Sequence, residues 1–445
     1  MLQILKFAAH HQRLVKLEER QDTPVKKDSF AALRYKDFRA YLGMRFFFTF
    51  AYQMQAVVIG FYIYQITHSK LALGYIGLCE AIPAISIALY GGYIADKYEK
   101  RKLLFTIFSI VLFASLTIFT VTLNSMSHYV QAGWVVPVIF VMIFLNGVAR
   151  AFYGPTTFAI YAQSIPKELY PNGSTWSSSA WQIATILGPA AGGLIFGHWG
   201  ITPTFIIINA MLLVSLVLVY FLKSYPPVYI PKESIWESLS AGIHFVFKNK
   251  MMLGAMSLDL FSVFFGGAIA LLPVFAHDIL KVGSEGLGIM RATSSLGAVL
   301  TMLAMTRFSP MGRPWRNLLI AVAGFGLSIL CFGLSKSFYI SLIFLFTEGA
   351  FDSVSVIIRS TIMQLLTPDE MRGRVSAVNS MFIGSSNEIG AFESGTAAEL
   401  LGTVPSVIFG ACMTLIVVSV TFLKTRNLIP AKLADIGTPT EKSTA

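Results

Sequence analysis

Long apolar segments alternate with short polar ones along almost the whole chain. Twelve of these segments hold roughly 20 residues or more, enough for a helix to cross the about 30 Å core of a bilayer. The predicted spans are residues 38–67, 71–95, 103–125, 134–153, 174–197, 203–222, 251–277, 284–307, 317–335, 338–358, 375–400 and 404–423. The pattern therefore predicts an all-α membrane protein with twelve transmembrane helices.

A polar stretch at mid-chain divides these spans into two sets of six. It begins with three prolines and continues with Ser234-Ile-Trp-Glu237, which has the spacing of a helix capping box. Apolar residues then recur at helical spacing up to Val246, which predicts either an amphipathic helix on the inner membrane surface or a plain spacer helix. We predict a basic cytoplasmic tail (1–37), an N-terminal six-helix bundle (38–222), a linker (223–250), a C-terminal six-helix bundle (251–424) and a second cytoplasmic tail (425–445).

A weak internal repeat supports this division. A shift of 202 residues places Asn146-Gly147 on Glu348-Gly349 and Gly193 on Gly395. Repeats of this kind occur in transporters whose substrate site lies between two pseudo-symmetric bundles near the middle of the membrane.

Composition agrees with a membrane protein and sets its orientation. The chain is 55% hydrophobic and only 13% charged, and its net charge of +11 falls in the gaps between apolar segments, which argues against nucleic-acid binding. Most Lys and Arg residues lie in the loops and tails of one side, whereas the loops of the other side hold Lys70, Lys281 and Lys336. The positive-inside rule then places both termini in the cytoplasm.

Enzyme, metal and cofactor chemistry find little support in the sequence. Cys79, Cys331 and Cys412 are far apart in apolar segments, the seven histidines lack metal-ligand spacing, and no phosphate-binding loop is present. We expect no cofactor, no metal and no ATP-driven pump.

The loop between the second and third predicted spans, residues 92–102, carries the clearest motif and is called the gate loop below. It resembles the loop of the major facilitator superfamily that reads Gly-x-Leu-Ala-Asp-Arg-x-Gly-Arg-Lys, with Glu99 in place of the second glycine. The matching residues are Gly92, Ala95, Asp96, Lys97, Lys100 and Arg101. The resemblance implies a contact that closes the inner side: Asp96 meets a helix N-terminus of the other half, and Lys97 and Arg101 pair with acids or lipid phosphate. A charged loop that serves only topology is the alternative.

A second resemblance lies in the fifth predicted span. Gly188-Pro189-Ala-Ala-Gly192-Gly193 is similar to a stretch found in exporters of the superfamily. Proline interrupts helix hydrogen bonding and glycine allows close helix approach, so the segment is either a bend or a small-residue packing surface. Short matches along nearly the whole chain, such as Gly242-Ile-His-Phe245 and Arg372-Gly-Arg-Val-Ser376, resemble the branch that contains the bacterial enterobactin exporter and drug-efflux proteins.

Charged residues inside predicted spans are candidate functional groups, because each costs about 2.5–3.5 kcal/mol to insert. Glu348, Asp352 and Arg359 share one stripe of the tenth span, which in the superfamily lines the central cavity. Glu348 is our leading candidate for a carboxyl that takes up a proton. A fixed salt bridge of Asp352, with Arg359 or with Arg150 of the other half, is the alternative for this stripe.

Four further polar residues are weaker candidates. Asp259 in the seventh span is expected to face the cavity or to bind a neighbouring helix, and Glu80 is expected to form an outer gate pair with Arg291. Arg45 extends toward the inner surface or binds cargo, and Gln53 supplies neutral hydrogen bonding in the first span.

The sequence as a whole predicts a secondary transporter of the bacterial inner membrane. We expect a monomer that exports a bulky organic small molecule by alternating access in exchange for protons, surrounded by membrane lipids. A lipid or lysolipid flippase of the same fold and a non-transporting membrane sensor are the alternatives. The identity of the cargo does not follow from the sequence.

Overall fold

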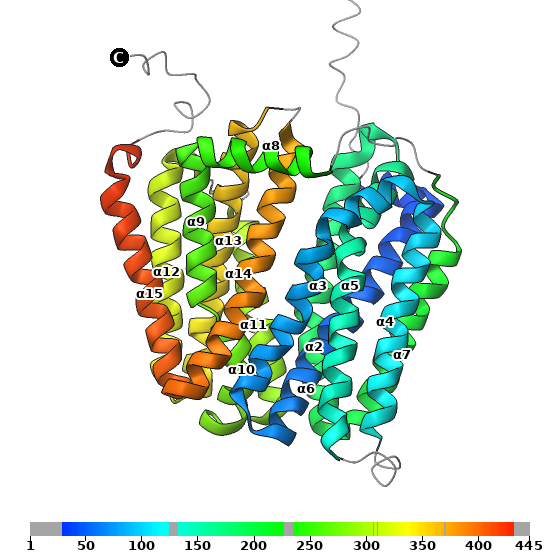
Figure 1. Ribbon diagram of the computed structural model, residues 1–445, viewed down its shortest axis with the longest axis horizontal. Helices are drawn as coiled ribbons and strands as arrows, with labels where there is room; N and C mark the ends of the chain where they lie inside the picture. The colour runs from blue at the N-terminus through cyan, green and yellow to red at the C-terminus, as the bar shows by residue number, and fades with distance from the viewer. Residues whose placement is uncertain are drawn as a thin grey trace, which may run out of the picture.

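Helices make up all the regular secondary structure in the described part of the chain, residues 29–123, 132–226, 235–305, 307–308, 310–368 and 371–430 of this computed structural model (Figure 1). The long helices of the first half are α2 (Lys36–Thr67), α3 (Lys70–Lys97), α4 (Lys100–Thr122), α5 (Ala132–Ser164), α6 (Tyr170–Trp199) and α7 (Ile201–Tyr220). Those of the second half are α9 (Lys250–Phe265), α11 (Gly283–Met305), α12 (Pro314–Leu334), α13 (Phe338–Leu366), α14 (Arg372–Leu401) and α15 (Thr403–Lys424).

Eleven helical segments of the described residues are long and apolar enough to cross a membrane. The twelfth, α14, has 30 residues but carries Asn387, Glu388, Glu393 and Glu399, so it is less apolar. It packs against α3 of the other half, which gives its polar side chains protein neighbours in place of lipid. The predicted all-α fold with twelve transmembrane helices is confirmed.

One predicted span is not a continuous helix. Residues 251–277 divide into α9, a 3₁₀ turn η4 (Ala268–Leu271), a short α10 (Leu272–Val274) and a π-helical turn η5 (Phe275–Ile279). The break falls at Gly266 and Gly267, two adjacent residues with the lowest helix propensity after proline. The apolar pattern continues through the break, so hydropathy alone does not detect it.

The long helices form two groups, which are visible in Figure 1 as α2 to α7 and α9 to α15. Buried aromatic residues hold the first group together: the Phe48 ring of α2 stacks on Phe108 of α4 and Tyr153 of α5, with centroids 4.4 and 4.7 Å apart. In the second group Phe275 lies 4.6 Å from Phe332. Such packing is a main source of helix association in lipid, where burial of apolar surface gives little gain. The residue limits assigned above to the bundles and tails stay a prediction.

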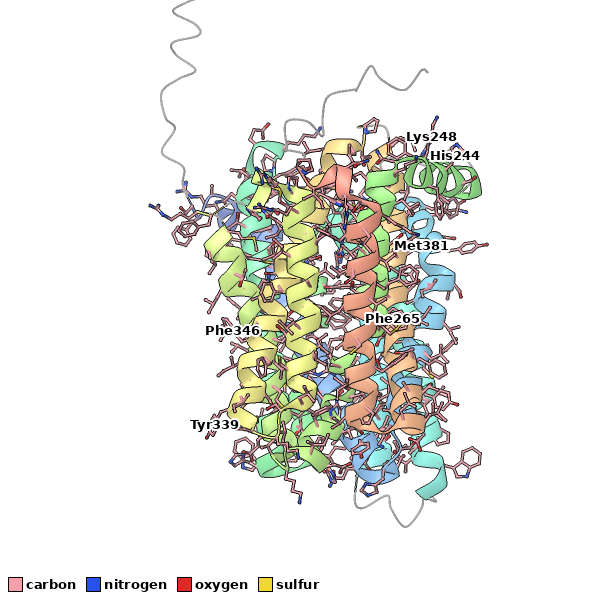
Figure 2. The ribbon with its side chains drawn as sticks, turned by 90° about the vertical axis from the view of Figure 1, so that its left-hand side faces the viewer. His244, Lys248, Phe265, Tyr339, Phe346 and Met381 are labelled. Atoms are coloured by element: carbon pink, nitrogen blue, oxygen red, sulfur yellow. The ribbon has the colours of Figure 1, made fainter. Side chains whose placement is uncertain are left out.

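The linker contains α8 (Ile235–Lys248), which lies across one end of the molecule (Figure 1). Its Val246 is fully buried beside Met252 and Val375, while His244 and Lys248 are exposed (Figure 2). A linker helix is therefore present as expected. The predicted capping residue Ser234 and the side chain of Glu237 lie outside the described part. Below, the end of the molecule near α8 is the α8 end and the opposite one is the far end.

Candidate functional site

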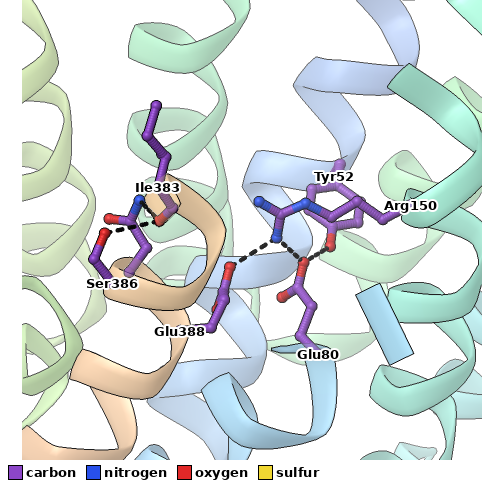
Figure 3. Close-up of polar contacts among 7 residues, drawn as sticks. Tyr52, Glu80, Arg150, Ile383, Ser386 and Glu388 are labelled. Carbon is purple, nitrogen blue, oxygen red and sulfur yellow. Dashed lines mark hydrogen bonds and ion pairs between the residues drawn. The ribbon is translucent and has the colours of Figure 1, made fainter. Parts of the chain in front are cut away.

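A cluster of four polar side chains joins the two groups of helices (Figure 3). Arg150 of α5 donates from Nη1 to Glu80 Oε1 of α3 at 2.5 Å and to Glu388 Oε1 of α14 at 2.8 Å. Tyr52 of α2 donates its hydroxyl to the same oxygen of Glu80. We call these four residues the Arg150 cluster. Because Glu388 belongs to the second group and the other three to the first, any separation of the groups here breaks an ion pair.

Two glycines explain why three helices meet at Glu80. A methyl group on Gly147 of α5 would lie 2.5 Å from the Glu80 carbonyl oxygen, and one on Gly77 of α3 would lie 2.8 Å from the Glu388 carbonyl oxygen. Both positions therefore require a residue without a side chain. Arg150 follows Gly147 by three residues and Glu80 follows Gly77 by three, so each charge lies on the face that the glycine brings into contact.

The cluster holds one cation and two acids in a membrane span. With both carboxylates ionised it carries a net charge of −1, and uptake of one proton makes it neutral. The Arg150 side chain is 47% exposed, whereas those of Glu80 and Glu388 are 16% and 17% exposed. Arg150 is thus the most exposed of these three charged side chains.

A second polar site lies between α11 and α13, within the second group. Ser294 Oγ donates to Glu348 Oε2 at 2.7 Å, and Glu348 is buried. A methyl group on Gly349 would meet the Ser294 carbonyl oxygen, so this glycine brings the two helices together beside the carboxylate. Asp352 lies one turn further along α13 and is partly buried. Glu348 and Asp352 thus share one stripe of α13, as the spacing indicates.

The third site is an ion pair between α9 and α13. Asp259 accepts a contact from Nη1 of Arg359, and the two side chains are 9% and 5% exposed. The predicted salt bridge of Asp352 with Arg359 or Arg150 is therefore wrong, because both arginines are bound to other acids. Arg359 lies about 10 Å along α13 from Asp352, whereas Asp259 of α9 lies at the same height as Arg359.

Two other sequence candidates also have neighbours that differ from the expected ones. Glu80 binds Arg150 and Tyr52 rather than Arg291, so the predicted Glu80–Arg291 gate pair is wrong. Arg45 is held inside the first group, where its Nη1 donates to the Tyr41 hydroxyl at 2.8 Å. Tyr41 lies one turn nearer the start of α2, and the predicted extension of Arg45 to the inner surface stays a prediction.

The gate loop is mostly helix. α3 continues through Gly92 and Asp96 to Lys97, and α4 begins at Lys100. The side chain of Asp96 lies outside the described part, so the expected contact of Asp96 stays a prediction. Lys97 Nζ lies 5.5 Å from the centre of the Tyr93 ring, and the Arg101 guanidinium lies over another ring, that of Tyr220, at 5.2 Å.

Glu99, the residue that departs from the superfamily motif, has a structural role that the sequence analysis missed. Its carboxylate accepts the backbone N–H groups of Arg101 and Lys102 and thereby caps α4. The same carboxylate accepts the backbone N–H of Tyr225 at 3.2 Å, and Lys100 N–H donates back to the Tyr225 carbonyl at 3.1 Å. An acidic residue directly before a helix start is a signal for the first contact, but no local pattern indicates the second.

The Gly188–Gly193 motif lies in α6, which continues unbroken through Pro189 to Trp199. Its glycines face two helices. A methyl group on Gly188 would lie 2.9 Å from Gln53 Cβ of α2, and one on Gly192 would lie 3.0 Å from the Met54 carbonyl oxygen. Gly193 instead faces Gly288 of α11, in the other group. The motif is thus a contact surface for both groups.

Direct contacts between the groups continue at the far end. Glu399 of α14 accepts hydrogen bonds from the first two backbone N–H groups of α3, at 3.1 and 3.4 Å. Asp278 of η5 accepts one from Tyr64 of α2, and Glu285 of α11 pairs with His198 of α6 at 3.0 Å. None of these pairs was predicted, because their members are between 87 and 329 residues apart in the chain.

Apolar contacts reinforce the same end. Val57 and Phe61 of α2 are buried in one cluster with Leu271 and Phe275 of the second group. A methyl group on Gly74 of α3 would lie 3.1 Å from the Phe392 carbonyl oxygen of α14. Backbones of the two groups thus approach within a few ångströms here.

Residues 27–438 match the family described as transmembrane secretion effector. The chain is 23% identical over 374 residues to the enterobactin exporter EntS of Shigella boydii and to that of Escherichia coli, covering 83% of this chain and 87% of either exporter. Among solved structures, it is similar to the peptide transporter POT in complex with sulfate (TM-score 0.71, 12% identity, 89% of this chain and 95% of that one). It is also similar to the nucleoside transporter NupG (TM-score 0.66, 15% identity, 87% and 98%).

The structural similarities show the fold alone, whereas the family match covers almost the whole chain. Both agree with twelve helices in two groups. The chain belongs to the transmembrane secretion effector family of the major facilitator superfamily and is a multi-pass membrane transporter resembling the enterobactin exporter branch.

Proposed function

We propose that this transporter exports a bulky organic small molecule by alternating access and that inward movement of protons drives the export. The observation that carries the proposal is the position of the Arg150 cluster, which combines an excess carboxylate with a contact between the two groups of helices. The relationship to enterobactin exporters supports export of an organic molecule of siderophore or drug size.

The coupling follows from the charges of the cluster. When Glu388 is ionised, its ion pair with Arg150 holds α14 against α5. Protonation of Glu388 removes the ionic part of this attraction and allows the two groups to separate, and loss of the proton restores it. Release of cargo and uptake of a proton then involve the same contact, as an exchange mechanism requires.

Glu348 is the second candidate for the proton site. It is buried and its described hydrogen-bond partner is the neutral Ser294, so a charge on this carboxylate has little compensation. Because both residues lie within the second group, a proton here acts on the cargo cavity rather than directly on the contact between groups.

Direct contacts at the far end support an inward-facing state. The positive-inside rule places the α8 end in the cytoplasm, so the far end faces outward. We therefore place the monomeric protein in the bacterial inner membrane with both termini in the cytoplasm. Cargo then enters from the α8 end and leaves after the far-end contacts open.

Transport by inside-out vesicles under an imposed pH gradient tests the proposal. A panel of a siderophore, a cationic drug and a lysolipid is offered to vesicles with the natural protein and with Glu388→Gln, Glu348→Gln or the surface control Glu168→Gln. We expect one compound to accumulate while the pH gradient falls. We expect Glu388→Gln to reduce the pH-driven accumulation at least tenfold. Glu168→Gln should accumulate the compound to the same level as the natural protein.

Each other result has a defined meaning. Accumulation without any change of the pH gradient contradicts proton coupling but not export. Loss of coupling in Glu348→Gln, with Glu388→Gln unaffected, moves the proton site to α13. Accumulation of the lysolipid alone favours a lipid flippase, and no accumulation of any compound contradicts export.

A further inference from the structure

Arg291 of α11 is a charged residue that takes part in none of the ion pairs described above. It lies eight residues from the far-end start of α11, about 12 Å into the membrane. The other three arginines deep in the spans have described partners: Arg150 and Arg359 bind acids, and Arg45 binds a tyrosine hydroxyl.

The direction of Arg291 follows from the two faces of α11. Leu296, Leu300 and Leu303 are 42%, 46% and 62% exposed and mark the lipid side. At 100° per residue, Arg291 points roughly opposite to these leucines, in the same direction as Met302. Met302 accepts a hydrogen bond from Gln182 of α6 at 3.3 Å, so this direction leads inward, to the boundary between the two groups.

No described residue compensates the charge of Arg291. Its Nε is buried and lacks a hydrogen-bond acceptor, and within the described part of the chain no ion pair or hydrogen bond involves its guanidinium. Arg291 as a whole is only partly buried. Ser294, one turn along the same helix, is already engaged by Glu348.

An unpaired guanidinium inside a membrane is costly, and this cost falls when an anion binds. A guanidinium is planar and offers parallel N–H donors that match the oxygens of a carboxylate, phosphate or sulfonate. A cation or a neutral apolar molecule would gain nothing from this group.

We propose that Arg291 binds an oxyanion group of the transported molecule, so that the cargo is an organic anion. This inference rests on the proposed transport function and specifies its substrate class. In the bound state the anion takes the place of the missing counter-ion of Arg291.

Equilibrium binding to the purified protein in lipid nanodiscs tests the inference. The probes are matched pairs of equal shape: 1-naphthoate with 1-naphthamide, and 1-naphthalenesulfonate with its sulfonamide. We expect at least one anion to bind ten times or more as tightly as its neutral partner. Arg291→Gln should remove this preference, Arg291→Lys should retain part of it, and the exposed control Arg316→Gln, near the start of α12, should keep it.

Thermal unfolding separates binding from a structural role. Because Arg291 lacks a described partner, Arg291→Gln should unfold at the same or a higher temperature than the natural protein. The anion should raise the unfolding temperature of the natural protein but not that of Arg291→Gln. Equal binding of anions and neutral partners, survival of the preference in Arg291→Gln, or no anion binding at millimolar concentration would each overturn the inference.

The transport assay keeps the two proposals distinct. An anion that binds through Arg291 and is not exported by vesicles contradicts the export function alone. A neutral compound that Arg291→Gln exports at the natural rate contradicts the anion site and leaves export intact.

Discussion

The two ends of the boundary between the helix groups are built differently. At the far end, helices of the two groups touch directly through Gly74 and Gly193, and three carboxylates bind across the boundary. At the α8 end, a separate helix lies against both groups: α8 packs on α14 and also contacts α3. The far end is therefore joined by many direct contacts that must break together, whereas α8 links the two groups at the α8 end.

The difference indicates which end is easier to open. Close backbone approach at glycines is sensitive to a single added carbon, because packed helices have no spare volume. A helix laid across an end can stay with one group when the groups separate. Three substitutions test this comparison, in order of decreasing effect.

The largest effect is expected from Gly193→Leu. Its side chain would collide with the Ser284 carbonyl oxygen and with Gly288, and overpacking of this kind costs about 1–3 kcal/mol. The state with a closed far end should therefore lose roughly five- to a hundredfold in population, with a similar loss of transport in vesicles. Gly133→Leu, where an added side chain meets open space, is the matched control. Full transport by Gly193→Leu would show that the far end does not need this contact.

A smaller effect is expected from Glu399→Gln. The carboxylate binds the N-terminus of α3, where a negative charge contributes about 0.3–1 kcal/mol, so its loss should open the far end roughly two- to fivefold more often. The reporter is a cysteine at buried Leu73 in a background without Cys79, Cys331 and Cys412, labelled by an impermeant thiol reagent from the far-end side. Slower or unchanged labelling would contradict a role for Glu399 in closure.

The smallest effect is expected from Asp96→Asn at the α8 end. We expect folding to stay intact and the inward-open population to rise, because Asp96 should act mainly in the state in which the α8 end is closed. If the state described here is inward-facing, the inward-open population is already the main one. Labelling of a cysteine at Met302 by a thiol reagent added from the α8 end should therefore rise less than twofold. A decrease in that labelling would contradict the role proposed for the gate loop.

Hydropathy located the membrane-spanning segments, although not the break at Gly266 and Gly267, because a membrane span must satisfy its backbone internally and be apolar over about 20 residues. It placed Arg150 and Glu388 within two of these segments. It did not show which charges meet, because the Arg150–Glu388 pair is separated by 238 residues and depends on how Gly77 and Gly147 bring three helices together. Pairing is a property of the packed helices, and a helical stripe such as Glu348–Asp352–Arg359 indicates only a shared face.

The contact of Glu99 with Tyr225 sets the length of the chain segment that links the two groups of helices at the α8 end, called the tether below. Tyr225 is held to the start of α4, and α8 is held on α14, so the covalent connection between the two anchors runs from Tyr225 to Ile235. Ten peptide units reach at most roughly 33–36 Å when fully extended. This span limits how far the molecule can open at the α8 end, so shortening the tether by a few residues should reduce the size of the largest cargo that enters before it affects smaller ones.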